Sequence, residues 1–120
     1  MNESGKGNVA VDKSFELALQ IIDFTEVLNK QGKYVVAKQL LRSGTAVGAL
    51  VAESQHAESK ADFIHKMKIA LKEANETNYW LALCEKSTHL PIGESQQNLC
   101  NEVIRILSKI VVSAKANSNI

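Results

Sequence analysis

The chain has 120 residues, of which 45% are hydrophobic and 22% are charged, and its formal net charge is +1. This length predicts one domain, and the apolar fraction is too high for a disordered chain. The nearly balanced charge excludes a strongly basic nucleic-acid-binding domain, so any contact with nucleic acid must come from a local patch. The polar N-terminus and the lack of a long apolar run predict a soluble cytoplasmic protein without a membrane span.

Apolar residues recur at helical spacing through nearly the whole chain, and strand signals are almost absent. The sequence predicts four helices, over residues 13–31, 34–55, 60–86 and 96–115. Amphipathic helices with short connections favour an all-α fold, an antiparallel up-and-down four-helix bundle. The expected organisation is a flexible tail over 1–11, a bundle domain over 12–116 and a frayed C-terminus over 117–120.

The expected helix boundaries depend on capping residues. Asp12 is a plausible N-cap of the first helix, and Gly32 is expected to end it. Ser59 with Asp62 resembles a capping box at the start of the third helix. Ser95, which follows a loop marked by proline and glycine, is expected to cap the fourth helix.

Apolar spacing predicts a buried face on the first and third helices. On the first helix, the expected core stripe with its flanks comprises Phe15, Ala18, Ile22 and Thr25, then Leu17, Ile21, Phe24 and Leu28. On the third helix, a strict heptad seam comprises Phe63, Met67, Ala70, Ala74, Thr77, Leu81 and Cys84.

The stretch "RSGTAVGALVAES" contains Gly44 and Gly48 inside the second predicted helix. No strand precedes it and no Walker lysine follows, so it does not match a phosphate-binding loop. On a helix both glycines fall in the middle of the apolar stripe. Since each glycine costs about 0.5–1 kcal/mol relative to alanine, we expect a close approach to this backbone, with packing inside the bundle as the main explanation and a ligand as an alternative.

A second apolar surface is expected outside the core. Ser43, Val47 and Leu50 lie along one flank of the second helix, with Ser54 beyond them. On the back of the third helix, the same arithmetic places Ile69, Tyr79, Trp80 and Leu83. An exposed tryptophan beside aliphatic residues is typical of an interface, so these residues are candidates for an oligomer interface or a partner-binding face.

Catalysis is the least favoured interpretation, and we expect no enzyme, no metal and no cofactor. Glu53 with His56 and Asp62 with His65 have the Glu-x-x-His type of spacing found in di-iron bundles, but helical geometry points them away from the core. The two cysteines fall in apolar helical patterns, where a buried thiol is a poor nucleophile.

Basic side chains form a candidate nucleic-acid site. Lys38 and Arg42 lie one turn apart on the outer face of the second helix, while Lys68, Lys72 and Lys86 lie on one side of the third. Together they compose a modest patch for phosphate contacts. Acidic neighbours at pairing distance favour a merely solvated, charged face over a nucleic-acid site on these residues alone.

The segments "LLRSGTAVGALVAES" and "SKADFIHKMKIALKEANETNYWLALCEKS" resemble the family of 23S rRNA intervening-sequence proteins. That family also includes the accessory variability determinant of diversity-generating retroelements. The resemblance covers roughly residues 15–110. This chain has Ala46 where the family commonly has Ser, and Leu50 where it commonly has Asn.

The resemblance implies a short antiparallel bundle that assembles into a homopentameric, barrel-like ring without enzymatic activity or a metal. It also implies RNA or DNA as possible ligands and a reverse transcriptase as a possible partner. Arg42 matches the arginine of the family's second-helix motif, Lys68 and Lys72 match basic positions of the third, and Tyr79 and Trp80 match an aromatic pair. The first hypothesis is therefore a non-enzymatic homo-oligomer that acts as an RNA-binding or accessory scaffold. The alternatives are a pure protein-interaction module and a metal-dependent enzyme.

Overall fold

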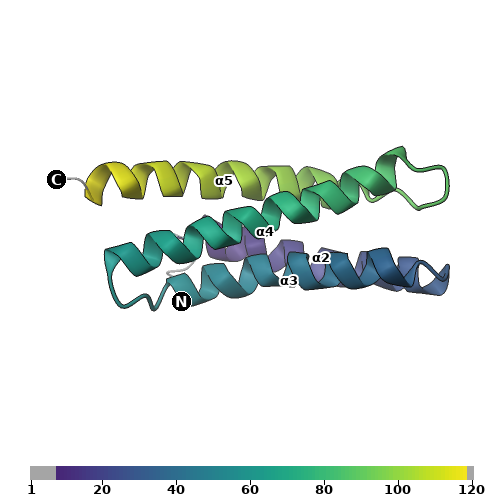
Figure 1. The fold of residues 1–120 in the computed structure, drawn as a ribbon, viewed down its shortest axis with the longest axis horizontal. Helices are drawn as coiled ribbons and strands as arrows, with labels where there is room; N and C mark the ends of the chain where they lie inside the picture. Colours follow the sequence, from purple (N-terminus) through teal and green to yellow (C-terminus); the bar gives the residue numbers. More distant parts are fainter. Residues whose placement is uncertain (1–7, 119–120) are drawn as a thin grey trace.

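Four long helices make up most of the computed structural model, which describes residues 8–118. They are α2 (Val9–Lys30), α3 (Tyr34–Ser54), α4 (Lys60–Lys86) and α5 (Glu94–Ser118). Successive helices run in opposite directions (Figure 1). Each helix packs against the next and α5 packs back against α2, while within residues 8–118 no Cα atoms of the diagonal pairs approach within 8 Å. The predicted all-α, up-and-down four-helix bundle is confirmed.

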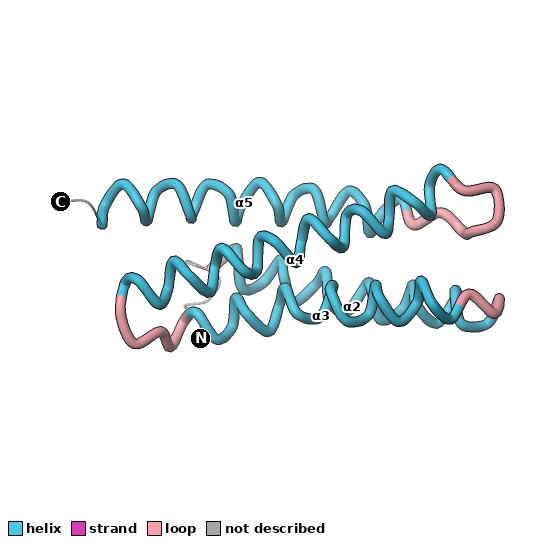
Figure 2. The backbone as a smooth tube through the Cα atoms, in the orientation of Figure 1, coloured by secondary structure: helices cyan, strands magenta, loops and turns pink. Residues whose placement is uncertain are grey.

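The bundle is elongated, 50 × 29 × 21 Å, and its connections gather at its two ends. The loops after α2 and α4 lie at one end, and the loop after α3 lies at the other (Figure 2). The start of α4 and the end of α5 share that second end. There the two helices diverge, because α4 runs obliquely to α5 (Figure 1).

The N-terminal boundary differs from the sequence prediction. The first helix starts at Val9, and its N-cap is Asn8, whose side-chain oxygen accepts a hydrogen bond from Val11 N at 3.3 Å. Asp12 lies in the first turn, where its negative charge complements the helix dipole, so it is not the cap. Residues 8–11, which were expected in the tail, therefore form the cap and the first residues of α2. Residues 1–7 lie outside the described chain.

The other helix ends follow their capping chemistry. Gly32 adopts φ +76°, and the N–H groups of Gly32 and Lys33 donate to Asn29 O at 3.0 Å and Leu28 O at 2.8 Å, which is a Schellman motif. Ser59 Oγ accepts from Asp62 N at 3.0 Å. The predicted stop and the predicted cap are confirmed at both sites.

The last helix is longer at both ends than the spacing predicts. It begins at Glu94, two residues before the expected start, and Gln97 N donates to Gly93 O at 2.9 Å. Ser95 is therefore inside the helix and does not cap it. The helix continues to Ser118, so residues 117 and 118 belong to it, while residues 119–120 lie outside the described chain.

The core confirms the heptad seam of α4 but shifts the buried face of α2. All seam positions of α4 are buried except Phe63, which is half-buried. On α2 the expected central residues Phe15 and Ile22 are 64% and 40% exposed. The buried apolar positions are Ala10 near the start of the helix and the residues expected only as flanks, namely Leu17, Ile21, Phe24 and Leu28. Thr25 of the expected central stripe is also buried.

The two glycines of α3 explain which face of α2 is buried. A Cβ at Gly44 would lie 2.8 Å from Ile21 Cγ2, and a Cβ at Gly48 would lie 3.1 Å from Ser14 O. The absence of side chains at these positions lets α2 lie directly against the α3 backbone. The close approach is thus made by a helix of the same chain, and Ile21 is fully buried there.

Candidate functional site

A basic row follows the outer face of α4. Lys68, Lys72, Tyr79 and Lys86 lie within about 40° of one another around the helix axis and span about 27 Å along it. All four are exposed, Tyr79 by 58%. Among the described residues, none of the three lysines has a carboxylate within salt-bridge distance. We call these four residues the α4 row; it presents three ammonium groups and one aromatic ring to solvent.

The predicted partner of this row on α3, Arg42, is engaged within the bundle. Its Nη2 lies 2.6 Å from Glu76 Oε1 and 3.1 Å from Glu73 Oε1. Glu76 also accepts a hydrogen bond from Trp80 Nε1 at 3.2 Å. The bond from Arg42, followed by that from Trp80, lowers the pKa of Glu76 below its ordinary value. A phosphate would have to compete with these two carboxylates for the exposed guanidinium, and the nucleic-acid role of Arg42 stays a prediction.

Lys38, the other basic residue expected on α3, is exposed. It lies one turn before Arg42, outside the pair of carboxylates that holds that residue. Of the five predicted basic residues, the structure therefore aligns three on α4, leaves Lys38 exposed on α3 and pairs the exposed Arg42 with two carboxylates of α4.

The expected apolar flank of α3 is not on the outside. Ser43 and Val47 are 0% exposed, and Ser54 is 2% exposed. Ser43 Oγ lies 2.8 Å from Thr77 Oγ1, which lies 2.8 Å from Glu73 O. Since a hydroxyl has one proton, Thr77 donates to the carbonyl and Ser43 donates to Thr77. This buried link between α3 and α4 corrects the interface role expected for Ser43 and Val47.

The remaining interface candidates divide by exposure. Leu50, Ile69 and Trp80 are half-buried, and Leu50 and Trp80 pack against the core. Tyr79 and Leu83 are exposed, by 58% and 38%. The Tyr79 and Trp80 rings meet edge to face, with centroids 5.5 Å apart, so the exposed phenol ring packs against a partly buried indole.

Sequence reasoning missed an apolar stripe on the outside of α2. Phe15, Leu19 and Ile22 are 64%, 50% and 40% exposed. Their i, i+4, i+7 spacing puts them on one line, opposite the buried face of the helix. Apolar residues on two sides of α2 were the available signal, but periodicity alone does not say which side faces the core. We call these three residues the α2 stripe.

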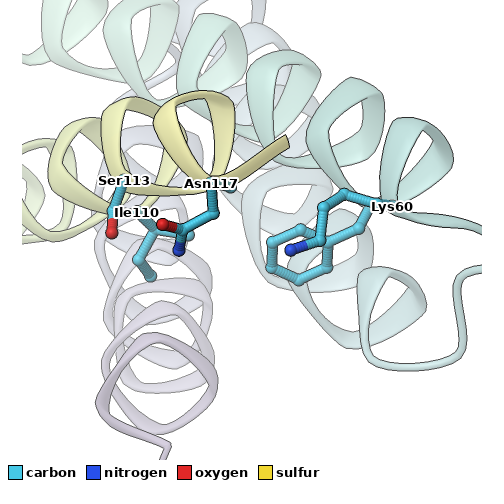
Figure 3. Close-up of a pocket in the computed structure, with 6 residues that line it drawn as sticks. Lys60, Ile110, Ser113 and Asn117 are labelled. Atoms are coloured by element: carbon cyan, nitrogen blue, oxygen red, sulfur yellow. The ribbon is translucent and has the colours of Figure 1, made fainter. Parts of the chain in front are cut away.

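A cleft separates the start of α4 from the end of α5. One hollow, of about 270 Å³, is lined by Lys60, Phe63, Ile110, Ser113, Ala114 and Asn117. In Figure 3, Lys60 on α4 faces Ile110, Ser113 and Asn117 on α5. A second hollow, of about 600 Å³, is lined by Lys60, Ala61, Ile64, His65, Lys68 and Lys115. Lys60 borders both hollows, which together we call the α4/α5 cleft.

The residues weighed for catalysis are scattered or engaged. The Lys66 ammonium, followed by the N–H of Glu58, lowers the pKa of Asp62 below its ordinary value. No group of three potential metal ligands occurs within residues 8–118. Burial raises the pKa of the Cys84 thiol and raises that of Cys100 to about 12, so both expected buried thiols are protonated at neutral pH. In the part of the chain described, no helix combines the length and apolarity required to cross a bilayer.

Comparisons with known proteins cover nearly the whole bundle. Residues 6–110 match the family model of the 23S rRNA-intervening sequence protein. A crystal structure of a protein of unknown function from the S23 ribosomal protein family of Bacteroides thetaiotaomicron is 43% identical to this chain. The match has a TM-score of 0.80 and covers 86% of this chain and 98% of that one. A search of curated proteins finds no significant match.

Proposed function

Since this chain belongs to the 23S rRNA-intervening sequence protein family, we propose that it is a non-enzymatic scaffold that binds RNA and assembles into a homo-oligomer. RNA binding is assigned to the α4 row and assembly to the α2 stripe. A pentamer and an accessory role beside a reverse transcriptase are the specific form we favour, because the resemblance described above implies them.

The α4 row is the observation that carries RNA binding. Three exposed lysines without salt bridges in the described chain lie in one line, so phosphates gain attraction there without displacing a carboxylate. Tyr79, within the same line, offers a ring on which an unpaired base can stack. A local row of this kind is compatible with a net charge of only +1.

The α2 stripe supports assembly. A phenylalanine and two aliphatic side chains in line, each at least 40% exposed, form an apolar surface that a second copy would remove from water. Repeating the α4 row around a closed oligomer would multiply the phosphate contacts, which raises the apparent affinity for a long RNA.

A pure protein-interaction module is the second candidate. It is favoured by the exposed Leu83 beside Tyr79, because an aliphatic residue next to the aromatic ring also suits a protein partner. This candidate predicts an absence of salt-dependent RNA binding.

Fluorescence anisotropy with a labelled RNA hairpin tests RNA binding. We expect affinity to fall steeply between about 50 and about 200 mM salt, because bound lysines displace counterions. The double variant Lys72→Glu/Lys86→Glu should weaken binding at least about tenfold and flatten the salt dependence. Tyr79→Ala should weaken binding by about 1–3 kcal/mol while leaving the salt dependence unchanged, because it removes stacking alone.

The matched control is Lys30→Glu/Lys109→Glu, which changes net charge equally at exposed positions of α2 and α5. We expect this control to retain most of the affinity. RNA binding through the α4 row is refuted if the hairpin is not retained at low salt, or if control and row variants lose affinity equally.

A further inference from the structure

The α4/α5 cleft combines apolar walls with a cationic rim, a pairing that the α4 row lacks. We propose that this cleft is the docking site for an acidic amphipathic helix of a partner protein. The proposal goes beyond RNA binding and assembly, because it assigns a different class of ligand to a site that shares only Lys68 with the α4 row.

Apolar side chains form the walls of both hollows. Phe63 and Ile110 line the smaller hollow, and Ile64 lines the larger one. All three are half-buried, so each retains surface that an incoming aliphatic side chain would cover. Two hollows that share Lys60 in their lining fit two successive apolar anchors of one helix, the usual arrangement when a helix docks in a groove.

Lysine side chains border the larger hollow. Its lining includes Lys60, His65, Lys68 and Lys115, and no aspartate or glutamate. The first turn of α4 adds the positive end of a helix dipole. The nearby Asp62 carboxylate is neutralised by Lys66, whose Nζ lies 2.9 Å from Asp62 Oδ1. Carboxylates that flank the apolar anchors of a bound helix would therefore meet the ammonium groups of Lys60 and Lys68, neither of which lies within salt-bridge distance of a described carboxylate.

Nucleic acid fits the cleft less well than an acidic helix does. A polyphosphate gains from cations spaced along an exposed line, as in the α4 row, and does not fill apolar hollows. An amphipathic helix instead presents apolar residues at i, i+3, i+4 and i+7 with polar residues beside them. Its apolar residues would cover the half-buried Ile64 while its acidic residues pair with the ammonium groups.

Peptide binding to the full-length protein tests the proposal. The probe is a labelled peptide of about 18 residues with leucines at i, i+3, i+4 and i+7 flanked by glutamates, and its control is a scrambled peptide of identical composition. We expect the helical peptide to bind at least about tenfold more tightly than the scrambled one, because only it places anchors and carboxylates on one face.

Two variants place the binding in the cleft. Ile64→Ser removes an apolar wall, and Lys60→Glu reverses charge at the first residue of α4, where an acidic residue suits the helix dipole and preserves the fold. We expect each to weaken peptide binding about tenfold, with helicity by circular dichroism unchanged. The matched controls, Val112→Ser on exposed α5 surface and Lys72→Glu in the α4 row, should leave it within about twofold.

These variants also separate the proposal from RNA binding. Lys72→Glu should weaken the hairpin and spare the peptide, whereas Ile64→Ser should do the reverse. The proposal is overturned if the scrambled peptide binds equally well or if the controls weaken binding as much as the cleft variants. It is also overturned if the protein retains RNA through the cleft, so that Ile64→Ser weakens the hairpin and not the peptide.

Discussion

At Glu76, one carboxylate joins two helices and an aromatic side chain. Oε1 holds Arg42 of α3, and Oε2 accepts the indole N–H of Trp80. The arrangement makes the arginine that the sequence offers for phosphate binding a cross-link between α3 and α4. Trp80, the only tryptophan of the chain, reports on this contact through its fluorescence.

The depressed pKa of Glu76 sets the pH range in which the contact contributes to stability. A carboxylate whose pKa is lowered by folding contributes fully above its unfolded pKa and loses that contribution as pH falls through the folded value. We therefore expect Glu76→Gln to reduce the free energy of unfolding by up to about 1 kcal/mol at pH 7, since the group is partly exposed. The loss should shrink at acid pH, as Glu76 of the wild type becomes protonated below the ordinary range of a glutamate.

Urea unfolding followed by Trp80 fluorescence at pH 7 and at acid pH measures this difference. Glu26→Gln, at an exposed position of α2, supplies the baseline for losing a carboxylate without this contact. An effect of Glu76→Gln that is equal at the two pH values would show that the carboxylate charge does not support the contact.

At the scale of helices, the contact of α2 with α3 depends on the lack of a side chain at Gly44. Alanine would gain about 0.5–1 kcal/mol in helix propensity, but its Cβ would lie 2.8 Å from the fully buried Ile21. Overpacking of a buried, β-branched side chain costs about 1–3 kcal/mol. We expect Gly44→Ala to lower the free energy of unfolding by about 1 kcal/mol or more in chemical denaturation.

The reverse change at an exposed position isolates the propensity term. Ala49→Gly on α3 should cost about 0.5–1 kcal/mol, because nothing packs closely there. If Gly44→Ala instead stabilises the protein by that amount, the two helices are not held at the distance described.

The helices also show which parts of the fold spacing can predict. The limits of α4 at residues 60–86 agree with the prediction, because a strict heptad and a capped start leave little choice. The buried face of α2 could not be chosen, since apolar residues occupy two sides of that helix and only the α3 glycines decide between them. Local sequence signals therefore predict the limits of a helix such as α4, whereas the side of a helix that faces the core depends on the helix packed against it.

The candidate site was harder to predict, because it depends on contacts between helices. The lysines of the α4 row share one helix, and their alignment follows from spacing alone. The environment of Arg42 is set by Glu73 and Glu76 of another helix, and these ion pairs cannot be predicted from spacing along one helix. The α4/α5 cleft arises where two helices diverge, a geometry that no residue pattern encodes.

For the whole molecule, the α2 stripe and the α4 row have complementary consequences. Three exposed apolar side chains on one line favour burial against another copy, while the lysines on α4 remain available to a polyanion. A scaffold of several copies would thus present repeated basic rows from one assembled body.

The solution mass of the intact protein tests this scaffold most directly. Light scattering coupled to gel filtration should give a multiple of the 13.1 kDa chain mass, five copies in the favoured form, and Phe15→Ser/Leu19→Glu should reduce it to one copy. Tyr34→Ser, an equally exposed aromatic position on α3, should leave the assembly intact. A mass of one chain for the wild type at micromolar concentration would contradict the account.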